Sequence, residues 1–162
     1  MVNVTLKVNG KTRSASVPPE MTLLRMLREQ FDLTGAKLGC DVGDCGACTV
    51  IVDGQPVNSC LILAGQADGR DVLTIEGLAD AEHLHPLQKL FEHFGSLQCG
   101  FCGPGVIMSA KALLDENADP STQEIRDALG GNLCRCTGYT KMIEAIKGAA
   151  CILRGEEVPA VK

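Results

Sequence analysis

The sequence predicts an α+β protein in two parts, a small mixed sheet around one helix followed by a bundle of four helices. Three observations lead to this prediction. Alternating apolar and polar residues mark short strands in the first part, helix-start signals recur in the second part, and eight of the nine cysteines form two groups of four, one in each part. A polar stretch near residues 77–85 lies between the parts, so we expect one domain over residues 1–76 and another over residues 77–162.

The first part contains two hairpin patterns and one helix pattern. The hairpins are expected to turn at Asn9-Gly10 and at Asp53-Gly54, because these residue types tolerate positive φ. Thr22 can cap a helix whose apolar stripe faces the sheet. The strands are expected over residues 2–8, 12–17, 49–52, 55–59 and 72–75.

The second part shows helix signals and no strand pattern. Pro86 and Pro104 each suit the first turn of a helix, where the missing N–H of proline has no partner to lose. Ser121 and Glu124 form a capping box ahead of a third helix, and Thr137 is expected to cap a fourth. The inward side chains of this last helix are expected to be Met142, Ile143, Ile146, Ala149 and Leu153.

Composition and charge exclude several classes of function. The chain has 162 residues, a net charge of −5 and 3% aromatic residues, which argues against a nucleic-acid binder. No apolar run approaches the roughly 18 residues of a membrane span, and the first residues carry no secretory signal, so we expect a cytoplasmic protein. In a reducing compartment, nine cysteines favour metal ligation over disulfides.

The sequence also lacks the residues of an independent enzyme. No carboxylates stand in a recognisable acid–base arrangement, and the sequence contains neither a G-x-G-x-x-G motif nor a P-loop. We therefore expect no catalytic residue on this chain, and neither a flavin nor a nicotinamide bound to it.

The first group of cysteines predicts an iron–sulfur site. Cys40, Cys45 and Cys48 follow the spacing C-x4-C-x2-C, and Cys60 comes soon after, which is the thiolate spacing of a plant-type [2Fe–2S] centre. Several glycines punctuate this loop, so its backbone can turn tightly and point N–H groups at the sulfurs. Zinc is the alternative, but zinc sites favour shorter, paired spacings.

The second group of cysteines is less specific. Cys99 and Cys102 form a C-x2-C pair, and Cys134 and Cys136 form a distant C-x-C pair. Each pair precedes a predicted helix, whose free N–H groups would favour an anionic iron–sulfur core. On spacing alone, both an iron–sulfur cluster and a structural zinc ion fit this group.

Three strings resemble the small iron–sulfur subunit of the molybdenum hydroxylase family, which includes xanthine dehydrogenase, aldehyde oxidoreductase and carbon monoxide dehydrogenase. The resemblance covers nearly the whole chain. The strings are residues 39–50 (GCDVGDCGACTV), 98–102 (QCGFC) and 134–139 (CRCTGY).

The resemblance implies a plant-ferredoxin-like (β-grasp) domain followed by a C-terminal four-helix bundle domain, each with one [2Fe–2S] cluster. It therefore favours iron at the second site as well. It also implies that Gln98 and Cys136 face a molybdenum–pterin cofactor in a partner. The implied ligands are Cys40, Cys45, Cys48, Cys60, Cys99, Cys102, Cys134 and Cys136.

The same resemblance implies a hetero-oligomeric oxidoreductase in which this chain passes electrons. They would leave a large molybdenum–pterin subunit, cross the C-terminal and then the N-terminal cluster, and reach FAD in a medium subunit. Because the sequence ends soon after the helical part, we expect the flavin and molybdenum parts on separate chains. The substrate would be oxidised on the large subunit, and general likeness favours an N-heteroaromatic. The alternative is a free-standing ferredoxin-type electron carrier.

Overall fold

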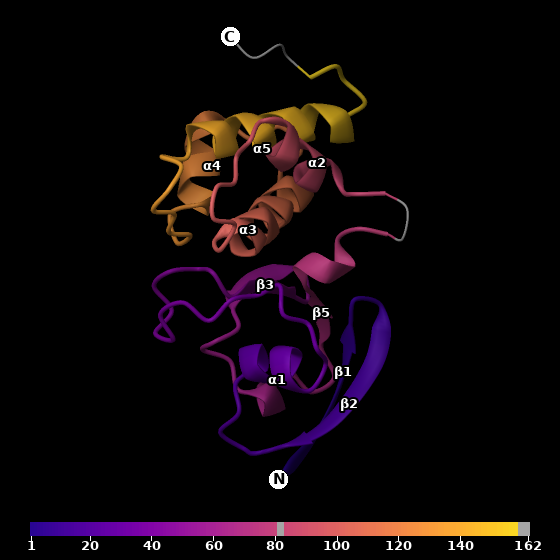
Figure 1. Cartoon of the computed structure of the whole chain (residues 1–162). Coiled ribbons are helices and arrows are strands. Elements are labelled where there is room, and N and C mark those ends of the chain that lie inside the picture. Colours follow the sequence, from indigo (N-terminus) through magenta and orange to yellow (C-terminus); the bar gives the residue numbers. More distant parts are fainter. Residues whose placement is uncertain (81–82, 159–162) are drawn as a thin grey trace.

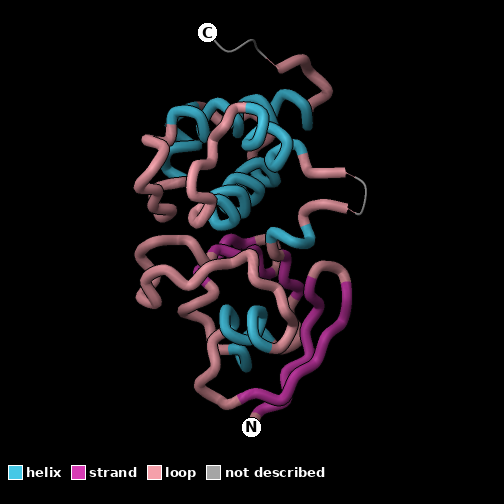
Figure 2. The backbone as a smooth tube through the Cα atoms, viewed as in Figure 1, coloured by secondary structure: helices cyan, strands magenta, loops and turns pink. Residues whose placement is uncertain are grey.

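The computed structural model describes residues 1–80 and 83–158, here called the N-terminal half and the C-terminal half. Figure 1 and Figure 2 show strands and one α-helix in the N-terminal half and helices in the C-terminal half. The strands are β1 (Val2–Val8), β2 (Lys11–Val17), β3 (Thr49–Val52), β4 (Gln55–Asn58) and β5 (Asp71–Leu73). The helices are α1 (Leu23–Glu29), α2 (Pro86–His93), α3 (Gly103–Glu116), α4 (Thr122–Ala128) and α5 (Thr140–Leu153), with the short 3-10 helices η1 (Ala64–Ala67) and η2 (Ile75–Gly77).

The strands form one mixed sheet in the order β2-β1-β5-β3-β4. Strand β1 runs parallel to β5, and the other neighbouring pairs are antiparallel. Both predicted turns are present, with φ of 50° and 78° at Asn9 and Gly10 and of 48° and 84° at Asp53 and Gly54. Positive φ at both central residues gives a turn whose twist matches that of the strands. The predicted α+β class with a mixed sheet is confirmed.

Strand β5 ends earlier than the predicted range 72–75. Thr74 leaves the ladder and exchanges hydrogen bonds with Asn9 at the tip of the first hairpin. The Thr74 N–H donates to Asn9 Oδ1 (2.9 Å), and Asn9 Nδ2 donates to Thr74 Oγ1 (2.9 Å). Ile75 then begins η2. A contact between residues far apart in sequence therefore sets the end of this strand.

Helix α1 contributes much of the core of the N-terminal half. The hydroxyl of Thr22 accepts the N–H of Arg25 (3.3 Å), which confirms the predicted N-cap. The apolar stripe of α1 is buried together with side chains of the sheet, as the spacing of the leucines in this helix predicts. The core includes Val4, Leu6, Leu23, Leu24, Leu27, Val50 and Val72.

Four helices, α2 to α5, make up the C-terminal half, and α5 lies across its far end in Figure 1. The capping box of α4 is confirmed, because Ser121 Oγ accepts the N–H of Glu124 (3.2 Å) and Glu124 Oε2 accepts the N–H of Ser121 (2.7 Å). The buried side chains shared by these helices include Leu87, Phe91, Val106, Ile125, Met142 and Ile146.

The predicted start of the last helix is wrong. Helix α5 begins at Thr140, and its N-cap residue is Tyr139, which has a left-handed backbone with φ of 69°. The hydroxyl of Thr137 lies 3.1 Å from Cys134 Sγ instead of capping the helix. At the other end, Leu153 is 48% exposed rather than inward, and it is the last residue of α5.

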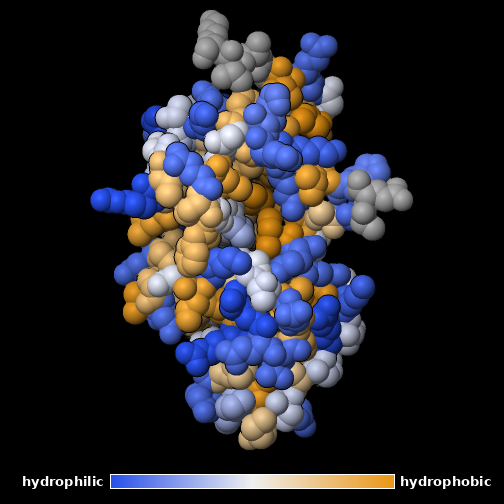
Figure 3. Space-filling view, viewed as in Figure 1, coloured by the Kyte–Doolittle hydropathy of each residue, from blue (hydrophilic) through white to orange (hydrophobic). Residues whose placement is uncertain are grey.

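The two halves meet where α3 lies against β3 (Figure 1). A Cβ added to Gly105 of α3 would stand 2.2 Å from the carbonyl oxygen of Gly46, so the two backbones touch directly. Ile51, Met108 and Ala112 form a small buried cluster beside this contact. Figure 3 shows hydrophobic side chains gathered around the junction. Among the described residues, none of the helices has both the length and the apolar content to cross a membrane.

Candidate metal centres

The first candidate centre is the loop of residues 34–48, between α1 and β3. Cys40 Sγ accepts backbone N–H groups from Val42 (3.5 Å), Asp44 (3.3 Å) and Cys45 (3.4 Å). Positive φ at Gly43 (85°) lets the backbone curl around the sulfur. These hydrogen bonds, with that of Val42 the largest cause, lower the pKa of Cys40 to about 7. The loop therefore stabilises a negatively charged sulfur, as a metal ligand requires.

The structure brings the other three cysteines of the first group to the same place. The thiol of Cys45 contacts that of Cys40. Cys48 and Cys60 are buried, and Ser59, the neighbour of Cys60, links their two segments because its hydroxyl donates to the Cys48 carbonyl (2.7 Å). Burial, followed by the neighbouring Cys48 and then Cys40, raises the pKa of Cys60 to about 12. Thiols that oppose each other's ionisation in a buried space are suited to a cationic partner.

The second candidate centre lies where α3 begins. Sulfur atoms of Cys99 and Cys136 lie 3.6 Å apart, and both residues are exposed. Burial, and then the neighbouring Cys134, raises the pKa of Cys102 to about 12. Burial opposes ionisation of Cys134, but the Thr137 hydroxyl and backbone N–H groups outweigh it and lower its pKa. All four sulfurs of the second group thus influence one another.

Only one of the two predicted helix starts lies directly at this centre. Cys102 is the N-cap residue of α3, so its position beside free helical N–H groups agrees with the prediction. Helix α5 begins four residues after Cys136, and a turn containing Gly138 (φ 67°) intervenes. The Thr137 hydroxyl replaces the predicted helix end as the polar partner of a cysteine sulfur.

Gln98 and Cys136, which the resemblance places toward a pterin, lie together at the surface. Gln98 Nε2 donates to the carbonyl oxygen of Cys136 (3.1 Å), and both residues are exposed. Cys102, by contrast, is buried with the core of the C-terminal half.

A direct backbone contact joins the two centres. The N–H of Leu133 donates to the carbonyl oxygen of Cys45 (2.9 Å), and Leu133 precedes Cys134 in the chain. Beside it, Asn132 Nδ2 donates to the carbonyl oxygen of Gly46 (3.0 Å). The burial of Asn132 could not be predicted from the sequence, because a single amide outside any periodic pattern gives no sign that it is buried. Cys45 of the first group and Cys134 of the second are thus connected through one hydrogen bond and the backbone of Leu133.

The donor atoms fit a [2Fe–2S] cluster at each centre. Such a cluster takes four cysteine thiolates and is tuned by hydrogen bonds to their sulfurs, which Cys40 and Cys134 both receive. Over residues 1–80 and 83–158, no three His, Cys, Asp or Glu side chains are grouped in the way that a single metal ion requires.

Comparison with known proteins identifies both halves. A 2Fe-2S iron-sulfur cluster binding domain family matches residues 6–77, and a [2Fe-2S] binding domain family matches residues 74–147. The chain is 50% identical over 148 residues to the nicotinate dehydrogenase small FeS subunit of Eubacterium barkeri, covering 91% of this chain and 94% of that subunit. It is 46% identical over 160 residues to an aldehyde oxidoreductase of Megalodesulfovibrio gigas, covering 97% of this chain but only 18% of that protein.

A solved structure agrees with the sequence comparisons. Quinoline 2-oxidoreductase from Pseudomonas putida 86 superposes with a TM-score of 0.91 and 46% identity, covering 96% of this chain and 98% of the matched chain. The two domain families favour iron over zinc at both centres, and relatives that are subunits of larger oxidoreductases disfavour a free-standing ferredoxin. The chain belongs to the small [2Fe–2S] iron–sulfur subunits of the molybdenum hydroxylase family.

Proposed function

We propose that this chain relays electrons between a large molybdenum–pterin subunit and a medium FAD subunit of a cytoplasmic hydroxylase complex. The proposal divides the chain into a plant-ferredoxin-like domain over residues 1–76 and a four-helix bundle over residues 77–162, each holding one [2Fe–2S] cluster. When bound, the clusters supply the one-electron chemistry, while the chain supplies ligands, hydrogen bonds and a fixed separation. The eight proposed ligands are Cys40, Cys45, Cys48, Cys60, Cys99, Cys102, Cys134 and Cys136.

The hydrogen bond from the Leu133 N–H to the Cys45 carbonyl is the observation that carries this proposal. A protein with two unrelated metal sites has no need to place their ligand loops in direct contact. A relay does need this, because electrons must cross from one site to the other without a gap of solvent. The buried contact between Gly105 and Gly46 keeps water out of the same region.

The proposed direction of transfer rests on the family resemblance, and the exposed residues at each centre are compatible with it. Gln98 and Cys136 are exposed beside the second centre, so we infer that this surface meets the pterin of the large subunit. The exposed apolar side chains Val42 and Leu61, 62% and 58% exposed, lie beside the first centre, where we place the FAD subunit. Substrate oxidation belongs to the large subunit, and we propose an N-heteroaromatic substrate, since nicotinate and quinoline appear in the names of two relatives.

Electron paramagnetic resonance of the dithionite-reduced native complex tests the ligand assignment. We expect about four irons per chain and two distinct [2Fe–2S] signals. Cys45→Ser should remove one signal and Cys102→Ser the other. The matched control is Cys151→Ser, because Cys151 belongs to neither group and lies on α5 near Arg154 (Nη2 to Sγ 3.6 Å). A Cys45 or Cys102 variant that keeps both signals, or a native complex without iron, would refute the proposal.

A further inference from the structure

Residues 132–134 form a strap that touches both cysteine loops. Asn132 is 4% exposed, and its Nδ2 donates to the Gly46 carbonyl (3.0 Å) and approaches Thr49 Oγ1 (3.4 Å). Leu133 donates its N–H to the Cys45 carbonyl, and Cys134 comes next in the chain. The strap therefore fixes where the first loop lies relative to the second.

One hydroxyl group holds both ends of this strap. Tyr139 Oη donates to the carbonyl oxygen of Asn132 (2.9 Å) and accepts the N–H of Cys134 (2.7 Å). These two peptide groups lie on either side of the Leu133 α-carbon, and the first of them carries the N–H that reaches Cys45, so the hydroxyl fixes that peptide and the next one. Loss of the hydroxyl would free both groups at once.

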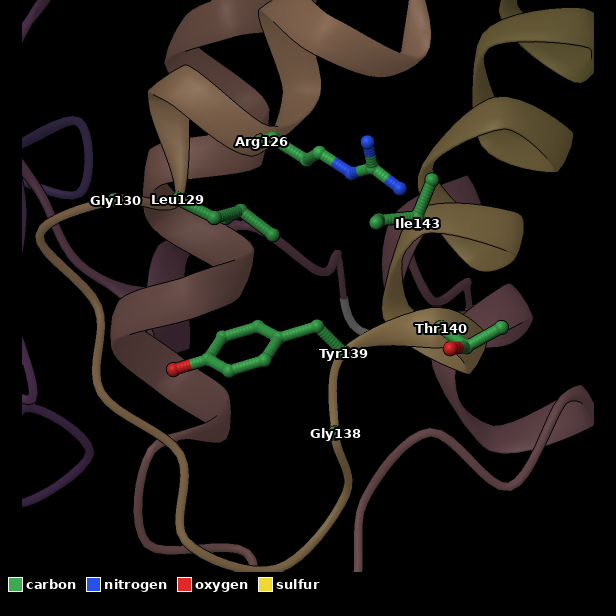
Figure 4. A pocket seen from close by; sticks show the side chains of 7 residues that line it. All are labelled: Arg126, Leu129, Gly130, Gly138, Tyr139, Thr140 and Ile143. Carbon is green, nitrogen blue, oxygen red and sulfur yellow. The ribbon is translucent and has the colours of Figure 1, made fainter.

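The Tyr139 ring packs against the core of the C-terminal half but is only partly buried. Figure 4 shows its ring extending away from the start of α5, below Leu129, with the hydroxyl at the far end. The ring borders a hollow of about 390 Å³ that Arg126, Leu129 and Ile143 also line. Its backbone has a φ of 69°, a left-handed conformation that a bulky residue adopts only when its surroundings enforce it. The two hydrogen bonds of the hydroxyl are the specific contacts that orient the ring.

The first cysteine loop packs so closely against residues 131 and 132 that the strap cannot move independently of it. A Cβ on Gly46 would stand 2.2 Å from the Gly131 carbonyl oxygen and 2.6 Å from Asn132 Nδ2. The backbones are thus in contact, and a shift of Asn132 either breaks its bond to Gly46 or moves the loop that carries Cys45.

We propose that Tyr139 and Asn132 are positioning residues, which hold the Leu133 amide on the Cys45 carbonyl and so fix the two cluster loops at one separation. Tyr139 acts on the cysteine loop of its own half, and Asn132 transmits this position to the other half. The inference rests on the proposed relay function, because the separation of the loops matters only when both hold clusters.

Tyr139→Phe and Asn132→Ala in the native complex test this inference. Phe keeps the ring and removes both hydrogen bonds of the hydroxyl, and Ala removes the contacts of the Asn132 amide with Gly46 and Thr49. We expect full iron content and both resonance signals, with a weaker magnetic interaction between the two reduced clusters. Hydrogen exchange at the Leu133 amide should accelerate by roughly fivefold for each hydrogen bond lost.

The matched control is Ser96→Ala. Ser96 is buried, and its hydroxyl donates to the Lys141 carbonyl (2.9 Å) in the first turn of α5, but it does not touch the strap. It should lower stability and leave the magnetic interaction unchanged. An unchanged interaction and unchanged exchange in both strap variants would overturn the inference, while a wild-type complex without two clusters would overturn the relay function itself. If the strap variants keep both resonance signals and their magnetic interaction and change only in stability, the strap has a purely structural role, which also contradicts the inference.

Discussion

At the scale of single residues, Gly46 meets two demands that only glycine satisfies, a positive φ and a close backbone approach, whereas Gly54 meets the first alone. Gly46 has a φ of 67°, and its missing Cβ leaves room for the Gly131 carbonyl, 2.2 Å from where that atom would be. Gly54 has a comparable φ of 84° but faces open space. Ala at either position bears the left-handed strain of about 1–2 kcal/mol, and only at Gly46 does overpacking add about 1–3 kcal/mol.

Gly46→Ala should therefore destabilise the chain by about 2–5 kcal/mol in chemical denaturation, against about 1–2 kcal/mol for the control Gly54→Ala. The Gly46 variant should also lose the resonance signal of the N-terminal cluster, because its loop must move away from the strap. Equal losses of stability in the two variants would show that the close approach contributes nothing.

Single residues also mark the limit of what the sequence predicts about the centres. Cysteine spacing and interleaved glycines predicted a sulfur that accepts N–H groups, and Cys40 does accept three of them. The role of Asn132 could not be predicted, because its partner Gly46 lies 86 residues away. The Tyr139 hydroxyl bonds to a loop that is close in sequence, but its left-handed backbone follows no sequence preference.

At the scale of elements, the capping box of α4 makes stability depend on pH. Hydrogen bonds from Ser121, and then from Asn117, lower the pKa of Glu124 below its ordinary value. A carboxyl group with a lowered pKa stabilises the fold above its unfolded pKa, and this contribution is lost as pH falls through its folded pKa. Removal of the cap by Ser121→Ala should cost about 1 kcal/mol.

The difference in unfolding free energy between the wild type and Glu124→Gln should thus be largest near neutral pH and shrink as the pH falls below the unfolded pKa of about 4.3 and through the lowered folded pKa. Urea unfolding at a series of pH values measures this difference. Glu92→Gln, an exposed change near the end of α2, serves as the control. A difference for Glu124→Gln that does not change with pH would contradict the argument.

Elements defined by local signals were predicted well, and elements that depend on distant partners were not. Both hairpin turns and the caps at Thr22 and Ser121 rely on neighbouring residues, so the sequence sufficed. Thr137 has the chemistry of a cap, but its hydroxyl lies against a cysteine sulfur and α5 begins later. The early end of β5 at Leu73 likewise follows from a hairpin tip that only the folded sheet brings near.

At the scale of the whole molecule, each half contains a small core and a group of four cysteines, and a backbone hydrogen bond joins the two cysteine loops. Halves of roughly 80 residues bury a limited apolar area, so inorganic clusters that tie loops together should add substantially to stability. The raised pKa of Cys60 and of Cys102, both about 12, means that protons compete strongly with metal for these sulfurs. Because the strap links the halves, loss of one cluster should also loosen the half that keeps the other.

Iron removal should therefore lower the melting temperature of the chain, and it should proceed faster as the pH falls. A stability loss of about 3 kcal/mol would lower the midpoint by more than about 10 °C for domains of this size. Calorimetry of the loaded and iron-depleted chain measures the first effect, and the decay of visible absorbance across a pH series measures the second.

Cys102→Ser should empty only the second centre. Hydrogen exchange in β3 should then accelerate, because α3 and the strap both contact the N-terminal half. Unchanged protection of β3 in this variant would mean that the halves are energetically independent, despite the buried contact between Gly46 and Gly105.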